Sequence, residues 1–402
     1  MNSNHRSLIL AICLLWLLNR GAQAEDRVDF SLGYYLEDHN RVEVWSPVLL
    51  WEADFNKSSV IRVQAVYDVV SGASPTGAPP ARKTKEVTST VYSTSYDVVG
   101  GPSGTTQVRR VTTTKQTTLV PYGKPILPLH EFEDRRLGLN LELEHRLEDW
   151  ILSGSVAYGT ESDYESLAGT IKVGREFNSK TTLINAGLSV GHDWVLHPAL
   201  DRWDGKDSIE GLVSVVQVIN PTTLLTVSGS LGSASGYLDD QYKYASVDDV
   251  IMPEHRPDQR DRRVAFVMLN KMIEPLNGSL EATYRLYNDS FGVTANTFGL
   301  TWFQNLGKHW VLAPSVRYYE QSAADFYAPQ FSGKPEFYSA DYRLAKLSSL
   351  TYGLKVIWKP NDRVQLSLGY DRYTMEGRDG GAASPEAFPS ANIITAGVKI
   401  WF

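Results

Sequence analysis

Alternation of apolar and polar residues constrains this chain more than any other feature. Between Arg136 and Glu144, positions 137, 139, 141 and 143 are all leucine, and the intervening residues are polar or glycine. The same period of two recurs at 280–287 and 364–371. Because a β-strand sends successive side chains to opposite faces, each segment has one apolar and one polar face. The pattern predicts an all-β protein.

The number and length of these segments narrow the prediction further. Sixteen can be counted: 27–37, 41–54, 59–70, 132–146, 150–161, 165–177, 181–194, 208–219, 223–235, 261–273, 278–289, 293–305, 309–321, 341–359, 362–375 and 391–402. Every second connection is a short turn, and the others include all the long ones: 71–131, 195–207, 236–260, 322–340 and 376–390. Strands of soluble proteins average about 5–6 residues, whereas a strand that crosses a bilayer needs about 9–11. These lengths therefore favour a membrane protein.

A sheet in a membrane has to close on itself, because lipid cannot pair its edge N–H and C=O groups. An even strand number with short periplasmic turns and longer outer loops is typical of bacterial outer-membrane barrels. Tryptophans near strand ends, such as Trp45, Trp150, Trp310 and Trp358, suit the two membrane interfaces. We expect a transmembrane antiparallel β-barrel of about 16 strands, or 18 if part of 71–131 also crosses the membrane.

The N-terminus predicts export. Arg6 precedes the apolar run 8–18, and Ala22-Gln23-Ala24 forms a small-x-small cleavage site. An uncleaved membrane anchor is disfavoured because the apolar run is too short to span a bilayer. We expect a signal peptide over 1–24 with cleavage after Ala24, then one barrel domain over 25–402 with a long Thr-rich insertion at about 71–131. Localisation in the bacterial outer membrane follows.

Composition excludes several other classes of protein. The only cysteine, Cys13, leaves with the signal peptide, which excludes disulfides and multi-thiolate metal sites in the mature chain. A net charge of -7 without a basic cluster argues against nucleic acid as a partner. No cofactor is expected.

The last segment adds a targeting signal. Ile394, Ala396, Val398, Ile400 and Phe402 lie on one face and end on a terminal aromatic residue. This pattern resembles the C-terminal strand signal by which bacterial outer-membrane proteins are recognised for insertion. The expected partners are therefore outer-membrane lipid and the barrel-assembly machinery, with a periplasmic or outer-membrane protein partner left open.

Several stretches carry a family resemblance: 68–80, 132–136, 160–166, 236–243, 284–289, 317–327 and 341–344. In these stretches the chain resembles a bacterial family of outer-membrane barrels known only as a domain of unknown function. The Thr-rich part at 83–120 lies outside the family pattern, and Ser290 stands where an acidic residue is expected. The resemblance implies the barrel, and it brings no activity and no catalytic residue.

Eight residues are expected to meet near one rim of the lumen, at the ends of consecutive strands: Arg285, Asp289, Arg317, Tyr319, Asp325, Tyr327, Asp341 and Arg343. Arginine and carboxylate pair in bidentate geometry, and tyrosine bonds to either. The favoured interpretation is a ladder that holds loops and wall together, because paired charges often satisfy only each other. The alternative is a constriction or ligand site, since rings of charged side chains set pore selectivity.

Three loop regions offer further candidates. In 71–131, the segments 85–98 and 106–119 predict a β-hairpin that projects outward, folds inward as a partial plug, or adds two strands. The acidic loop at 236–260 lacks a calcium-binding pattern and is interpreted as a solvated surface loop. His192, Asp193 and His197 are too irregularly spaced to predict a metal site.

The residues favour a channel over the other functions. A barrel of this size can enclose water. Charged residues of both signs are expected to face the lumen, and they indicate no ion preference: Arg62, Asp68, Arg136, Glu142, Glu144, Lys172, Glu176, Glu281, Arg285, Arg317 and Lys355. We expect a porin-like channel for small polar solutes. A partner-binding or sleeve barrel of an envelope complex is second, and a rim-site hydrolase using a loop histidine is third.

Overall fold

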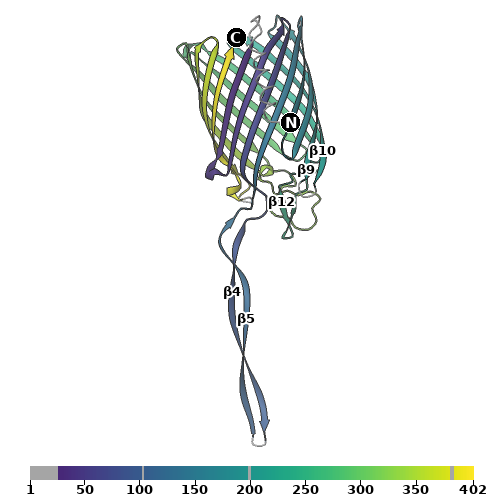
Figure 1. The fold of residues 1–402 in the computed structure, drawn as a ribbon, viewed down its shortest axis with the longest axis vertical. Coiled ribbons are helices and arrows are strands. Elements are labelled where there is room, and N and C mark those ends of the chain that lie inside the picture. The colour runs from purple at the N-terminus through teal and green to yellow at the C-terminus, as the bar shows by residue number, and fades with distance from the viewer. Residues whose placement is uncertain (1–25, 102–103, 198–200, 381–383) are drawn as a thin grey trace, which may run out of the picture. The chain divides into compact units, whose positions relative to one another are not determined.

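The computed structural model describes residues 26–101, 104–197, 201–380 and 384–402. The expected signal peptide and its cleavage site lie outside the described residues. Sixteen strands form one closed antiparallel barrel in which sequence neighbours pair and β1 closes on β20, which confirms the predicted fold. Figure 1 shows these strands tilted against the barrel axis. Among the described residues, no helix has the length and apolarity needed to cross a membrane.

The barrel strands, in spatial order, are β1 (Arg27–Glu37), β2 (Val42–Asn56), β3 (Ser59–Pro75), β6 (Leu129–Leu147), β7 (Trp150–Thr160), β8 (Tyr164–Phe177), β9 (Thr182–His197), β10 (Arg202–Asn220), β11 (Thr223–Gly236), β14 (Gln259–Ile273), β15 (Gly278–Asp289), β16 (Thr294–Leu306), β17 (Trp310–Gln321), β18 (Leu347–Asn361), β19 (Val364–Gly377) and β20 (Ser390–Trp401). Every connection at the end of the barrel where β1 begins and β20 finishes, which we call the turn end, is a short turn. The long connections lie at the opposite end, the loop end.

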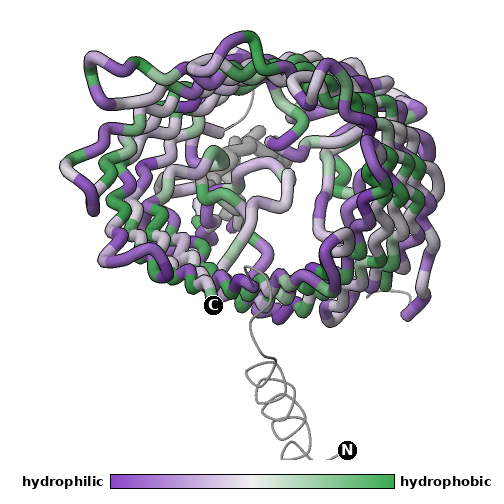
Figure 2. Tube along the Cα trace, turned by 90° about the horizontal axis from the view of Figure 1, so that it is seen from above, coloured by the Kyte–Doolittle hydropathy of each residue, from purple (hydrophilic) through white to green (hydrophobic). Residues whose placement is uncertain are grey.

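Alternation decides which side chains face outward. In β6, Leu139 is 45% exposed and Leu143 56%, whereas the side chains of Glu142 and Glu144 are only 17% and 12% exposed. The outer wall is therefore apolar and the inner wall polar, and the alternation of colour along the strands is visible in Figure 2. Trp310 and Trp358 stack on the outer face near the turn end, with ring centroids 5.6 Å apart. This placement suits a membrane interface.

Some strands differ from the predicted bounds. β3, β6 and β10 extend further toward the loop end than expected, because their ladders continue through polar residues that carry no apolar signal. β18 begins at Leu347 rather than at 341. The residues before it form the 3₁₀ helix η3 (Tyr342–Leu344), in which the Asp341 side chain accepts a hydrogen bond from the N–H of Arg343. The alternation of polar and apolar residues at 341–345 therefore does not mark a strand.

The insertion after β3 forms a compact unit of its own, Pro79–Pro128. It is the expected hairpin, longer than predicted: β4 (Ala81–Gly101) pairs with β5 (Gly104–Ile126) in a separate two-stranded sheet. The predicted 16 strands are therefore confirmed, and the alternative of 18 is excluded. A ladder this long forms because threonine and valine favour extended backbone and face each other across the strands, as Thr88 and Thr117 do.

The buried core of the barrel unit lies among the loops at the loop end. Two long connections, 237–258 and 322–346, are called the mouth loops here; the first carries β12 (Tyr244–Val247) and β13 (Val250–Pro253). Phe291, Val293, Ala324 and Leu344 form one buried apolar cluster, and Ala345, Leu347 and Phe388 form another. Figure 2 shows chain lying across the interior of the ring of strands. The remaining 3₁₀ turns are η1 (Asp38–Asn40), η2 (Glu274–Leu276) and η4 (Pro385–Ala387).

Candidate functional site

A network of charged side chains joins the two mouth loops. We call Asp239, Asp240, Lys243, Glu254, Arg256, Asp341 and Arg343 the mouth network. Asp341 is 1% exposed and accepts from Arg343 Nε at 2.8 Å and from Arg256 Nη2 at 3.0 Å. Burial alone would raise the pKa of Asp341, but Arg343, Lys243 and Arg256 together lower it to about 2. The carboxylate is therefore charged and fixes two guanidinium groups from different loops.

Glu254 and Lys243 extend this network. The Glu254 carboxylate accepts from Ser339 Oγ at 2.5 Å and from Asp240 N–H at 2.7 Å, and its burial raises its pKa despite the nearby Arg256. Lys243 Nζ donates to Ser74 Oγ at 2.9 Å and to Pro75 O at 2.5 Å, and burial lowers its pKa. The mouth loops are thus tied to each other and to the end of β3.

The interpretation of 236–260 as a solvated acidic loop is therefore wrong for part of it. Glu254 is 4% exposed, Asp240 pairs with Arg343, and Asp239 lies 3.5 Å from His255. Sequence reasoning missed the partners because they lie far along the chain: Asp240 and Arg343 are 103 residues apart. A loop has no periodicity that could show which residues it meets.

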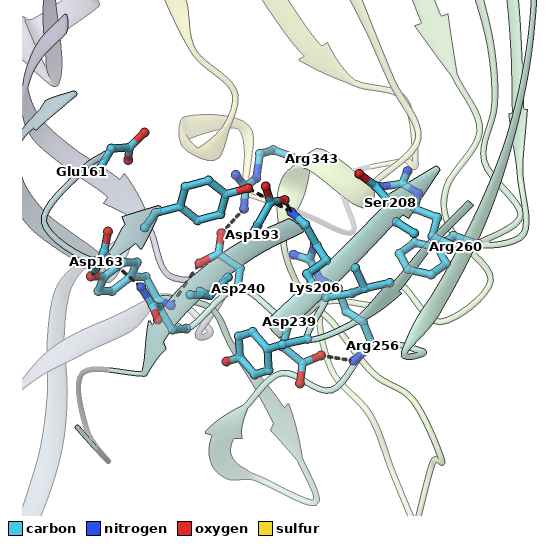
Figure 3. A pocket seen from close by; sticks show the side chains of 18 of the residues that line it. Glu161, Asp163, Asp193, Lys206, Ser208, Asp239, Asp240, Arg256, Arg260 and Arg343 are labelled. Carbon is cyan, nitrogen blue, oxygen red and sulfur yellow. Dashed lines mark hydrogen bonds and ion pairs between the residues drawn. The ribbon is translucent and has the colours of Figure 1, made fainter. Parts of the chain in front are cut away.

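A cavity of about 730 Å³ lies between the inner wall and the first mouth loop (Figure 3). Asp163 and Asp193 face it from the region of β7, β8 and β9, and Lys206 and Arg260 face it from β10 and β14. Lys206 Nζ lies 2.8 Å from Asp193 Oδ2. Charged side chains of both signs therefore line one cavity.

Three carboxylates gather beside this cavity: Asp134, Glu161 and Asp163 each offer an oxygen within 4.8 Å of the others. Burial raises the pKa of Glu161 to about 7, and the charge of Asp134 adds to the rise. Closely spaced oxygens are the ligands that hard cations prefer. The oxygens also serve the fold, because Asp163 accepts from Gln241 Nε2 at 2.7 Å and Asp134 accepts from Ser162 N–H at 3.3 Å.

Arg285 and Arg317 differ from the mouth network because they have no carboxylate partner among the described residues. Each faces the interior and lies over a tyrosine of its own strand: Arg285 lies 5.3 Å from the ring of Tyr287, and Arg317 lies 5.8 Å from that of Tyr319. A smaller cavity of about 150 Å³ adjoins Arg285 and is lined by Arg260, Arg285, Tyr287, Tyr319, Gln321 and Arg343, with Val293 and Leu344.

The eight residues predicted for the rim are thus divided among different environments. Asp289 is buried and organises the turn after β15, since it accepts from Arg260, Tyr287 and the N–H groups of Phe291 and Val293. Asp341 and Arg343 belong to the mouth network, and Asp325 is exposed. The Tyr327 hydroxyl is buried without a hydrogen-bond partner among the described residues. Arg285, Arg317 and Tyr319 remain on the inner wall.

The candidate histidines do not converge. His192 faces outward and lies 2.6 Å from Asp207, whereas Asp193 is the next residue on the strand and faces inward. His197 contacts the ring of Tyr237, and His130 stacks on Tyr242. The spacing of His192, Asp193 and His197 in the sequence predicted no metal site, and β9 places His192 and Asp193 on opposite faces of the wall.

Comparisons with solved structures find other barrels. A bacterial polysaccharide outer membrane secretin is 8% identical over 95% of this chain and 100% of its own, with a TM-score of 0.48. The outer membrane protein OpdK of Pseudomonas aeruginosa is 7% identical over 94% and 99%, with a TM-score of 0.41. The siderophore receptor PirA of Pseudomonas aeruginosa is 10% identical with a TM-score of 0.44, and the chain spans 62% of its length. No curated protein sequence matches the chain.

A family model matches the chain over residues 17–202 and 197–400, which together include every strand of the barrel. The match confirms the resemblance carried by stretches such as 132–136, 284–289 and 341–344. The chain belongs to the family described as "Protein of unknown function (DUF3570)".

Proposed function

We propose that this protein is a porin-like channel of the bacterial outer membrane that passes small polar solutes. The observation that carries the proposal is a set of charged side chains on the inner wall without ion-pair partners among the described residues: Glu281, Arg285, Arg317 and Lys355. Burying an isolated charge costs far more than a folded protein can offset. Such charges persist on an inner wall only if water reaches them, so the lumen is inferred to be hydrated.

The outer wall supports insertion in a membrane. Its exposed side chains are apolar on many strands; Ile171 is 63% exposed, Val213 56% and Leu368 59%. A soluble protein rarely exposes contiguous apolar surface of this extent. A closed barrel with an apolar outside and a hydrated inside is the architecture of an aqueous pore.

The mouth loops would set the selectivity of such a pore. They lie at the loop end and are fixed by the mouth network, so the opening between them and the wall has a defined lining. Charges of both signs line the adjoining cavity (Figure 3). Because charged side chains at a constriction select solutes, we assign this region the role of the filter.

A swelling assay tests the channel. Vesicles that contain the purified protein are placed in isotonic solutions of sugars of increasing size, next to vesicles without protein. Swelling in small sugars that declines with sugar size supports a pore. Protein-containing vesicles that swell no faster than protein-free ones in the smallest sugar would overturn it.

The insertion favours a second candidate, a partner-binding barrel of an envelope complex. A two-stranded hairpin is only marginally stable in water, yet β4 and β5 pair over about twenty residues in a sheet of their own. A binding partner would stabilise its exposed edges. Crosslinking in intact cells, comparing the full chain with a variant lacking 79–128, distinguishes the two: a protein captured by the full chain alone favours this candidate, and its absence argues against it.

A further inference from the structure

We propose that the inner wall around Arg285 holds a binding site for a small organic anion that carries a carboxylate or phosphate group. The inference deepens the proposed function and rests on it, since the anion is taken to be a solute that the channel passes. The site is the smaller cavity, about 150 Å³, where the walls of β15 and β17 meet the second mouth loop.

Charge pairing in this cavity leaves one guanidinium unbalanced. Arg260 is paired with Asp289, and Arg343 is paired with Asp341 and Asp240. Arg285 has neither a carboxylate partner nor a side-chain hydrogen bond among the described residues, although its guanidinium has five N–H donors. An anion is the ligand that would satisfy it, because bidentate pairing with an oxyanion is the strongest contact that arginine makes.

The strand register places a second guanidinium nearby. Arg285 is opposite Thr297 of β16, which is opposite Tyr319 of β17. Arg317 is two residues along from Tyr319, opposite Gly299, and also has no carboxylate partner among the described residues. Two strand spacings of about 4.8 Å and an offset of two residues, about 6.8 Å along the strand, separate the two arginine positions by roughly 12 Å. Both arginine side chains lie on the inner wall, and the two cations can therefore attract one anion.

The rest of the lining defines the ligand class. Tyr287 donates to Asp289 at 2.7 Å and Tyr319 donates to Gln321 at 2.6 Å, so these hydroxyl protons are already used and the rings remain as apolar walls. Val293 and Leu344 add further apolar surface. The cavity holds the volume of roughly five waters at about 30 Å³ each. A short carbon chain with a carboxylate at one or both ends fits both the size and the chemistry.

Calorimetric titration of the detergent-purified protein tests the site without relying on transport. The probes are succinate, inorganic phosphate and, as a halide control, chloride. We expect succinate to bind, Arg285→Gln to weaken its binding about tenfold or more, and chloride to give no comparable signal. Phosphate binding that matches succinate would assign the site to oxyanions in general, and weaker phosphate binding would assign it to carboxylates.

Arg263→Gln is the matched control, because Arg263 is an exposed arginine on the outer face of β14 without an ion pair among the described residues. Equal weakening by Arg285→Gln and Arg263→Gln, or no succinate binding by the unmodified protein, would overturn the site. Bilayer currents separate this result from the channel: conductance without succinate binding overturns the site alone. Succinate binding that depends on Arg285, without any conductance, supports the site and overturns the proposed function.

Discussion

Individual carboxylates at the loop end have different roles because their surroundings differ. Asp341 is enclosed by Arg343, Arg256 and Lys243, and these cations keep it ionised. Glu161 is surrounded by other carboxylates, and burial together with Asp134 favours its neutral form. The first carboxylate holds the mouth loops in place, and the second can change charge near neutral pH.

Replacing Asp341 with asparagine should loosen the mouth loops. Removing one member of a buried charge cluster leaves uncompensated cations and costs about 3–5 kcal/mol. Hydrogen exchange of 237–258 and 322–346 should rise in Asp341→Asn, while the barrel strands stay protected. Asp258→Asn is the control, since Asp258 is an exposed carboxylate of the same loop without an ion pair among the described residues. Unchanged exchange in Asp341→Asn would contradict this role.

From the lowered pKa of Asp341 we predict that the mouth loops become less stable in acid. The folded pKa of Asp341, about 2, lies below the usual value of 3.8, so the stabilising effect of this carboxylate is present above about pH 3.8 and is lost as pH falls toward 2. Protection of the mouth loops in the unmodified protein should therefore decline within that window. A loop region that stays equally protected at pH 2 would count against the assignment.

Glu161 predicts a change of ion preference near neutral pH. Its raised pKa means that it is mostly protonated below about pH 7 and charged above it. Reversal potentials measured in a salt gradient should shift toward cations as pH rises through 7. The shift should be absent in Glu161→Gln, and a shift of equal size in that variant would assign it to another group.

Among the elements, the strands were predictable and the loops were not. In β6, β15 and β19, apolar residues alternate with polar ones because one face of the strand is apolar and the other polar. This requirement acts on neighbouring residues, so it can be recognised in the local sequence. The strand bounds were less well predicted where the ladder continues through polar residues, as at the end of β3. Arg285 and Arg317 could be placed on the inner wall from their positions in the alternating pattern of their strands alone. Lys243 and Arg256 could not be connected to Asp341, because loop contacts depend on the closed barrel.

We predict that a charged substitution destabilises the barrel more on the outer face of a strand than on its inner face. Val156 of β7 is 56% exposed on the outer face, whereas Ser155 faces inward opposite Glu142. Val156→Arg should cost about 2–4 kcal/mol if this position lies near the bilayer midplane, and Ser155→Arg should cost less because Glu142 can pair with it. Unfolding by denaturant in lipid vesicles measures both. A larger loss for Ser155→Arg would contradict the assignment of the faces.

We predict that the barrel folds without the hairpin formed by β4 and β5. Pro75 of β3 pairs with Leu129 of β6, so Ala78 is only three residues along the chain from the partner of Leu129, and a short Gly-Ser linker can replace 79–128. A variant with 79–128 replaced in this way should still migrate as a folded, heat-modifiable barrel on gels. Failure to fold would show that the hairpin contributes to the stability of the barrel.

At the scale of the whole molecule, the buried core lies among the loops rather than along the strands. A 16-stranded barrel is too wide for side chains alone to fill, and its inner wall carries charges of both signs. In the proposed channel, the mouth loops, held by the mouth network, set how much of the loop end is open. The barrel could be predicted from the sequence because it repeats one local pattern, whereas the loop assembly follows from contacts that form only after the barrel closes.

Single-channel recording in planar bilayers tests the central claim most directly. Purified protein added to one side should produce stepwise increases in current, and Arg285→Gln should shift the reversal potential toward cations because it removes an unpaired positive charge from the inner wall. Inserted, folded protein that produces no current steps would contradict the account of this barrel as a water-filled channel.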